Sequence, residues 1–546
     1  MPFAFPSWLW APRRPLRALL IAAVAVPLAL PAGVHAQLPT LGDGSEMSAA
    51  AERRLGDRIA RSLYRDPDFV DDPVLVEYIQ AIWQSLMAAA RARGEMSDEL
   101  QERFAWEVLL GRDRTVNAFA LPGGYLGVHA GLIAITASRD ELASVLAHEL
   151  SHVTQRHISR LMTQQSRSTP LMLAAMVMGA LAAGRSPEAA NALIVGGSAV
   201  HAQGQLNFSR AMEREADRVG YGVMTGAGFD GHGFAGMFEK LQQASRINDN
   251  GSFPYLRSHP LTTERIADMR SRLPMAGLAP DTAGRSPAAD NGGNSRAQAT
   301  AGVLPPVNVT AATVPGGLAH AMVVARARVV SRPGVDALRA WAGEPDQGGF
   351  KAQPPVRQVV ALYAGALASV QQRDLDHART LAARLVPLVA GDARPARLVR
   401  LLGAEIELTG NRGAAAAAYL AVPADKAAPA GRPEVVYYAQ AGQHGSGARD
   451  VSDRLQTWVA RNPRDATAWQ LLAAAYRADG QPLRALRAEA EAQIAHVDWQ
   501  GAVDRYRAGQ ELMRAGGPGA DYVEASISDT RLREAELRLR EEAAER

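Results

Sequence analysis

The sequence predicts a mainly α-helical protein, in which an α+β domain with a small sheet is followed by an α-helical solenoid of tetratricopeptide-like repeats. Three observations predict this class: apolar residues follow helical spacing along most of the chain, short β-rich segments lie between residues 106 and 128, and an alanine-rich helical pattern repeats beyond residue 305. A chain of 546 residues is also too long for one ordinary core. We expect a leader at residues 1–36, a first domain at 37–272, a flexible linker at 273–306 and a helical region at 307–546.

The N-terminus has the pattern of a cleaved signal peptide. Three arginines precede an apolar run at residues 18–30, and Val34-His35-Ala36 offers a small-residue cleavage site. A membrane anchor is the alternative, but two prolines interrupt the run and it falls short of the ~20 residues that a span needs. The twin-arginine and Sec export routes both stay open. The sequence therefore predicts export to the periplasm.

Composition limits the chemistry and the partners. The chain has no cysteine, which excludes disulfides, thiolate metal sites, a cysteine nucleophile and a lipid anchor on cysteine. Any metal must therefore bind to histidines and carboxylates. The formal net charge of +3 comes from the arginines of the leader, so the mature chain is neutral and shows no basic block. We expect no nucleic acid partner.

The first domain is predicted to be helices around a small sheet. Residues 47–92 have helical apolar spacing, and the β-rich segments after them are broken by Pro122-Gly123-Gly124, a turn signal. Ser138 and Glu141 form a capping box that begins a helix expected to run through Arg160. Two further helices are expected at about 209–225 and 234–247.

Residues 170–184 are uncharged but too short to span a bilayer. A helical hairpin packed on the domain is one interpretation, and a lid or a flap facing a membrane or partner is the other. Peripheral membrane contact therefore stays open.

The C-terminal region shows a repeat. Trp469, Leu472, Ala473 and Tyr476 follow tetratricopeptide spacing, and weaker matches begin at Leu362 and Val399, close to multiples of a 34-residue period. A plain helical bundle is the alternative. Stacked repeats form a concave surface that holds protein segments, so we expect a protein partner.

His148-Glu149-Leu150-Ser151-His152 carries the chemistry. Two histidines four apart on a helix project from one face and can reach one zinc ion, and Glu149 lies beside them. Zinc lowers the pKa of its bound water, and a neighbouring carboxylate can take the proton as that water attacks a peptide carbonyl. The motif alone is moderately specific.

A catalytic zinc needs a third protein ligand and one open position. The segment Glu213-Arg214-Glu215-Ala216-Asp217, on another predicted helix, offers Glu213 as the ligand. Asp217 lies on the same face and is placed to accept the free ring N–H of a zinc-bound histidine. A solvated acidic helix face is the alternative for both carboxylates.

HExxH followed by ExxAD, and preceded by residues 117–124 (NAFALPGG), resembles the peptidases of family M48, and the leader and repeats resemble its periplasmic, repeat-bearing branch. The resemblance implies a gluzincin-type α+β domain, one zinc per subunit on His148, His152 and Glu213, and Glu149 as general base and acid. It implies a supporting role for Asp217.

The resemblance also implies that His259, in Ser258-His259-Pro260, coordinates the zinc as an inhibitory fourth ligand and gates the enzyme. A structural loop histidine is the alternative. Gly123, Gly124 and Tyr125 could begin an exposed edge strand on which an extended substrate aligns.

Members of that branch act on misfolded or stalled outer-membrane proteins, assist their assembly and touch the assembly machinery through their repeats. The resemblance thus implies a zinc endopeptidase of the periplasm with unfolded or misassembled envelope proteins as substrates. The competing hypothesis is a repeat-based periplasmic chaperone or adaptor whose metal site is silent or permanently gated.

Overall fold

The N-terminal part of the chain folds as helices around a three-stranded sheet. The computed structural model describes residues 47–164, 209–246, 252–273, 317–421, 431–442, 447–515 and 521–544. The elements of the N-terminal part are α2 (Ala49–Tyr64), α3 (Pro73–Ala92), α4 (Asp98–Arg103), β1 (Glu107–Gly111), β2 (Ala118–Leu121), the 3₁₀ turn η2 (Pro122–Gly124), β3 (Tyr125–His129), α5 (Ala130–Ile135), α6 (Arg139–Thr154), α7 (His157–Gln164), α11 (Arg210–Gly226), α12 (His232–Arg246), α13 (Tyr255–Ser258) and α14 (Thr263–Arg272).

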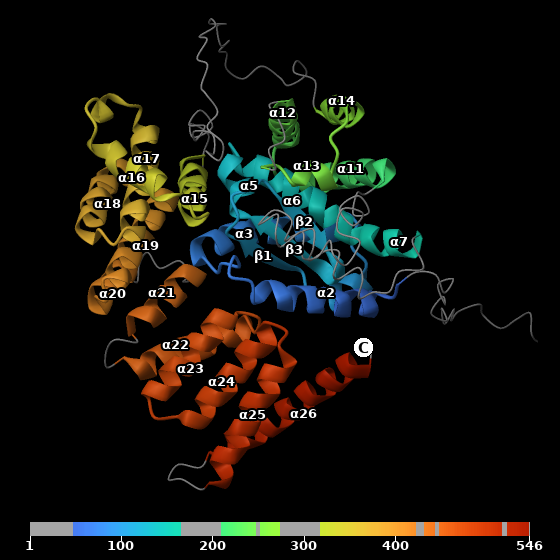
Figure 1. Ribbon diagram of the computed structural model, residues 1–546, viewed down its shortest axis with the longest axis vertical. Coiled ribbons are helices and arrows are strands. Elements are labelled where there is room, and N and C mark those ends of the chain that lie inside the picture. The colour runs from blue at the N-terminus through green and yellow to red at the C-terminus, as the bar shows by residue number, and fades with distance from the viewer. Residues whose placement is uncertain are drawn as a thin grey trace, which may run out of the picture. The chain divides into compact units, whose positions relative to one another are not determined.

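The sheet has the order β1-β3-β2, with β1 parallel and β2 antiparallel to the central strand β3. The η2 turn packs on α2, whereas β2 packs against α6, so the sheet lies between these helices (Figure 1). In turn, α11 and α12 cover α6. The α6 helix is therefore enclosed, and almost all of its side chains are buried.

The C-terminal part consists of successive antiparallel helices, as expected. Its elements are α15 (Gly317–Val330), α16 (Val335–Gly343), the 3₁₀ turns η4 (Glu344–Asp346) and η5 (Phe350–Ala352), α17 (Pro355–Gln371), α18 (Leu375–Val389), α19 (Ala393–Thr409), α20 (Gly413–Leu420), α21 (Arg432–Gly442), α22 (Ala448–Arg461), α23 (Ala466–Ala478), α24 (Pro482–Ala495), α25 (Trp499–Arg514) and α26 (Tyr522–Ala544).

The predicted repeat unit at Trp469 corresponds to the hairpin α23–α24, in which Ala473, Ala485 and Ala492 are buried. Two hairpins earlier, the ring of Tyr419 lies where a side chain on Gly403 would be, so α19 and α20 approach closely. Small residues thus bring paired helices together, and the assignment of these pairs as tetratricopeptide-like repeats stays a prediction.

The α15 helix joins the two parts. It packs against α5 and α3 on one side and against α17 and α19 on the other, and it is buried all round, which its almost wholly apolar sequence explains. Asp72 caps α3 through its Oδ1, and buried Arg326 of α15 binds both carboxylate oxygens of Asp72 at 2.8 Å. Arg326 also binds Glu405 of α19 at 2.8 Å. The helical region is therefore tied to the N-terminal helices by buried charge pairs.

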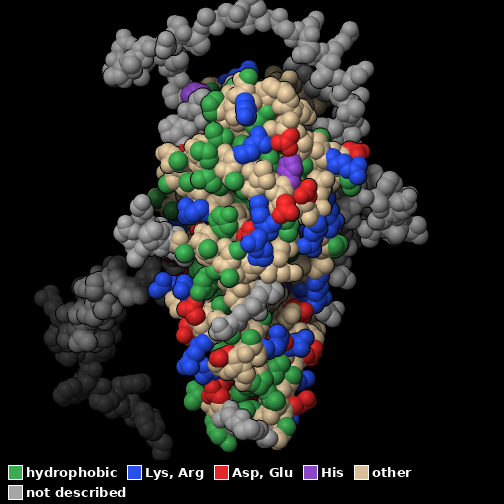
Figure 2. All heavy atoms as spheres, turned by 90° about the vertical axis from the view of Figure 1, so that its left-hand side faces the viewer, with side chains coloured by type: hydrophobic (Ala, Val, Ile, Leu, Met, Phe, Trp, Pro, Cys, Tyr) green, Lys and Arg blue, Asp and Glu red, His purple; other side chains and the backbone are tan. Residues whose placement is uncertain are grey.

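Basic, acidic and hydrophobic side chains are mixed over the face of the molecule that Figure 2 shows. None of the helices in the described ranges is both long and apolar enough to cross a membrane. The predicted leader, the segment 170–184 and linker residues 274–306 lie outside the described residues.

Candidate metal centre

The α6 helix holds the first two histidines. Ser138 caps it, since its hydroxyl accepts a hydrogen bond from the Glu141 amide at 3.1 Å, and no glycine or proline interrupts it. His148 and His152, one turn apart on the face toward α11, are almost completely buried. The predicted helix start and the shared face of the two histidines are both confirmed.

The α11 helix brings the carboxylates to the histidines. A side chain on Gly220 would meet the backbone of Ala147 at 3.1 Å, so glycine at this position lets α11 lie close against α6. Because of this close approach, the buried carboxylates of Glu213 and Asp217 reach His148: Glu213 Oε2 lies 3.5 Å from its Nε2, and Asp217 Oδ1 lies 3.0 Å from its Nδ1.

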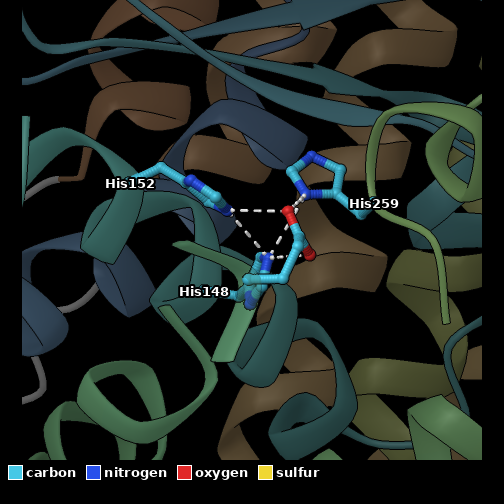
Figure 3. A group of neighbouring side chains, drawn as sticks. His148, His152 and His259 are labelled. Atoms are coloured by element: carbon cyan, nitrogen blue, oxygen red, sulfur yellow. Dashed lines mark hydrogen bonds and ion pairs between the residues drawn. The ribbon is translucent and has the colours of Figure 1, made fainter. Parts of the chain in front are cut away.

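His259 enters from a third direction. It follows the short helix α13, precedes Pro260, and is buried with its ring stacked on Tyr255 at a centroid distance of 4.6 Å. Its Nδ1 lies 3.0 Å from Glu213 Oε1 and 3.3 Å from His148 Nε2. His259 therefore faces the centre of the group, as Figure 3 shows.

The four ligand atoms have the spacing of a metal cage. His148 Nε2 and His152 Nε2 lie 3.1 Å apart, His152 Nε2 lies 3.5 Å from Glu213 Oε1, and all four ligand atoms lie within 4.8 Å of one another. A tetrahedron with zinc bonds of ~2.0–2.1 Å has edges of about 3.3–3.4 Å. A divalent cation at the centre of this group would be within reach of all four ligand atoms. The residues present therefore fit a divalent metal ion.

Arg265 supports the ligand group through Asp217 and Glu213, and no sequence pattern pointed to it. Its guanidinium donates to both oxygens of Asp217 at 2.7 and 2.8 Å. Its Nη1 also lies 2.7 Å from Glu213 Oε2 and donates to the Pro260 carbonyl at 2.9 Å. Arg265 is buried, so it balances the charge of a carboxylate that water does not reach. It also fixes the segment that carries His259.

The expected continuous helix through Arg160 is wrong, because the chain breaks after α6. Arg156 adopts a left-handed conformation with φ of 52°, and a new helix, α7, begins at His157. This bend turns the His157 ring back, so that its Nδ1 lies 2.9 Å from Nδ1 of His152. His157 stays outside the ligand group, but it contacts a ligand that a straight helix would have kept out of reach.

Glu149 lies between the sheet and His259. Its Oε2 accepts a hydrogen bond from the Ala120 amide of β2 at 2.9 Å, and its Oε1 lies 3.3 Å from His259 Nε2. The side chain is fully buried. Glu149 is thus held beside the ligand group without belonging to it.

The carboxylates control the protonation of the histidines. Burial opposes charge on His148, but hydrogen bonds to Asp217 and Glu213 outweigh it and raise the pKa of His148 to about 9. Burial lowers the pKa of His152 well below its usual value, so this ring is neutral. Burial would raise the pKa of Glu213, but the charge of His259 and hydrogen bonds from the histidines hold it well below its ordinary value. Glu213 is therefore ionised and available as a ligand.

The expected substrate-aligning edge is wrong at Tyr125. This residue begins β3, the central strand, whose two sides are already paired with β1 and β2. Gly123 and Gly124 are buried in the η2 turn, where a side chain would meet the Arg53 backbone and the Phe104 side chain. Among the described strands, β2 is the edge that faces Glu149.

Known proteins match this part of the chain. Residues 75–273 match the model of peptidase family M48. The matched segment includes His148, His152, Glu213 and His259. The beta-barrel assembly-enhancing protease of Escherichia coli K12 is 34% identical over 264 residues, which are 48% of this chain and 52% of that protein. The protein of the same name from Yersinia pestis is 35% identical over 237 residues, or 43% of this chain and 47% of that protein.

A more distant relative is the mitochondrial metalloendopeptidase OMA1 of Saccharomyces cerevisiae, 28% identical over 203 residues that cover 36% of this chain and 56% of that protein. The chain thus matches about half the length of these bacterial relatives. Peptidases of family M48 use a metal, typically zinc, which agrees with the ligand group described above. Residues 75–273 are therefore similar to the peptidases of family M48, both in sequence and in carrying a group of possible metal ligands.

Proposed function

We propose that this chain is a zinc-dependent endopeptidase of the bacterial periplasm that degrades misfolded or stalled outer-membrane proteins and assists their assembly. The observation that carries the proposal is the convergence of four buried ligand atoms, all within 4.8 Å of one another, beside Glu149. The names of the bacterial relatives, beta-barrel assembly-enhancing proteases, support the substrate class. The cleaved leader predicted at residues 1–36 would agree with export.

The roles of the residues follow from their positions. His148 Nε2, His152 Nε2 and Glu213 would hold one zinc ion, and zinc bound there would polarise a water molecule. Asp217 orients the His148 ring through Nδ1. Glu149 takes a proton from the attacking water and passes it to the leaving amine, and the Ala120 amide holds its carboxylate in place.

His259 acts as a gate in this proposal. Its Nδ1 is the fourth atom of the ligand group, which is the position that a catalytic zinc keeps open for water. Its Nε2 lies 3.3 Å from Glu149 Oε1, so the same ring also blocks the general base. Withdrawal of His259 would free both the coordination position and the carboxylate.

The edge of β2 is the proposed place for an extended substrate. The His129 amide donates to Asn117 at 3.0 Å, so alternate residues Ala118 and Ala120 direct their backbone groups away from β3. The Ala120 amide donates to Glu149, which agrees with this direction. A substrate strand paired there by main-chain bonds would pass beside the general base, and cleavage would depend on unfoldedness more than on sequence.

A second candidate function is a repeat-based periplasmic chaperone or adaptor with a permanently gated metal site. The position of His259 favours it, because a site with four protein ligands has the closed form of structural zinc. In either function, the helical region is the proposed contact for a protein partner, and by resemblance this partner is the outer-membrane assembly machinery.

The two functions separate on one substitution. Glu149→Gln should keep zinc and abolish cleavage of an unfolded protein such as casein, because it removes the base and leaves the ligands. Glu264→Gln is the matched control, since Glu264 is exposed and pairs with Arg214. The wild type and the control should lose cleavage only when a chelator removes zinc. Equal cleavage by Glu149→Gln and the control would exclude the proposed mechanism. If the wild type and the His259→Ala variant both bind zinc and neither cleaves the substrate, the result would favour the adaptor function.

A further inference from the structure

Each of the two α6 histidines has a partner behind its ring, but the two partners differ. Behind His148, the carboxylate of Asp217 contacts Nδ1 directly at 3.0 Å. Behind His152, the contact at Nδ1 is another imidazole, that of His157, at 2.9 Å. His157 in turn places its Nε2 3.1 Å from Glu215 Oε2. A chain of three side chains therefore runs from His152 to a carboxylate on α11.

The protons of this chain follow from the role of His152. If His152 binds the metal through Nε2, its proton lies on Nδ1, which then donates to Nδ1 of His157. His157 must accept there, so its own proton lies on Nε2 and is donated to Glu215. Only one tautomer of each ring satisfies both contacts. The carboxylate thus acts on the ligand through an intervening ring.

The surroundings hold this chain in place. The His157 ring is fully buried, and Arg160, one turn further along α7, binds the same Glu215 oxygen at 2.9 Å. Arg156, at the bend before α7, binds Glu52 of α2 at 3.1 Å and Ser159 at 3.2 Å. The bend that turns His157 toward His152 is therefore anchored at both ends.

We propose that His157 is a positioning residue of the metal centre, which fixes the orientation and tautomer of His152, and that Glu215 fixes His157 in the same way. The inference rests on the proposed zinc site. This inference assigns a function to the break between α6 and α7 and to Glu215. By contrast, Glu213 and Asp217 contact the ligand His148 directly.

Zinc affinity tests this assignment without relying on activity. In the full chain, measured by competition with a chromophoric chelator, His157→Ala should weaken zinc binding by ~10–100-fold, the usual cost of losing such a supporting partner. His157→Asn should recover most of the loss, because its amide oxygen can accept the proton of His152. Glu215→Ala should weaken binding less and should add nothing to His157→Ala, because both remove one chain of contacts.

Controls separate positioning from folding. Arg214→Ala removes an exposed ion pair on the same turn of α11 and should leave zinc affinity unchanged. Thermal unfolding of the metal-free proteins shows whether each variant folds. If His157→Ala folds and binds zinc as tightly as the wild type, the inference about His157 is overturned but the proposed function is not. If the wild type binds no zinc, both are overturned.

A spectroscopic measurement keeps the inference testable if His157→Ala does not fold. In zinc-loaded wild type labelled with ¹⁵N-histidine, long-range ¹H–¹⁵N correlations should show the proton of His152 on Nδ1 and that of His157 on Nε2. Variant His157→Asn assigns the second ring by loss of its signals. A proton on Nδ1 of His157 would contradict the inference, because that nitrogen could not accept from His152.

Discussion

Nε2 of His259 lies 3.3 Å from Oε1 of Glu149, while Nδ1 of the same ring faces the metal ligands. The His259 imidazole therefore contacts both the general base and the metal ligand group, and hydrolysis needs both of these to be accessible. If about 1.4 kcal/mol holds this arrangement closed, about one molecule in ten is open at any time.

His259→Ala should therefore raise cleavage of unfolded protein by about tenfold and increase self-cleavage. Initial rates on a fluorescent casein give the measurement, with zinc content determined in parallel. His232→Ala is the matched control, because His232 is exposed and pairs only locally with Asp230. Lower activity together with lost zinc would show that His259 is an ordinary ligand.

Zinc binding should depend on pH through His148. The carboxylates raise its pKa to about 9 in the metal-free protein, so at pH 7 zinc must displace a proton from this ring. Lowering the pH makes the displacement harder: affinity should fall about tenfold per pH unit below about 9. Competition titrations between pH 6.5 and 8.5 measure the slope. A flat profile in this range would mean that His148 is neutral before zinc binds.

Asp217→Asn should weaken zinc binding by ~10–100-fold and flatten this pH profile. The substitution removes the charge that faces His148 Nδ1, so the pKa of the ring falls and less proton is displaced. Asp268→Asn serves as the control, since Asp268 lies on the outer side of α14 and pairs with Arg272. Unchanged affinity in Asp217→Asn would remove Asp217 from the centre.

Arg326→Ala should lower the free energy of unfolding by ~3–5 kcal/mol, because it leaves the buried Asp72 carboxylate without its partner. Arg332→Ala removes a largely exposed ion pair with Asp68 between the same two parts and should cost only ~0–1 kcal/mol. Chemical denaturation of both variants compares them. Equal, small losses would show that α15 docks by apolar packing alone.

Much of this architecture was predictable because its determinants are local. The cap at Ser138, the four-residue spacing of His148 and His152, and the periodicity around Trp469 each depend on residues within a few turns of one another. Such patterns predicted the helices, the short strands and the shared face of the histidines, and the structure confirms them.

The remaining features depend on tertiary contacts. The break at Arg156 carries no glycine or proline signal, and contacts to Glu52 and Ser159 hold it, so the sequence predicted an unbroken helix. Arg265 resembles any other arginine until α14 brings it against Asp217. The order of the strands, which puts Tyr125 in the centre, likewise follows from pairing between distant segments.

X-ray absorption at the zinc edge of the purified wild-type chain, with metal content measured on the same sample, tests the ligand group most directly. We predict one zinc per chain, bound at ~2.0–2.1 Å by three imidazole nitrogens and a carboxylate oxygen, and one fewer imidazole in His259→Ala. Zinc-free protein, or zinc without histidine scattering, would contradict the convergence of His148, His152, Glu213 and His259 on a single ion.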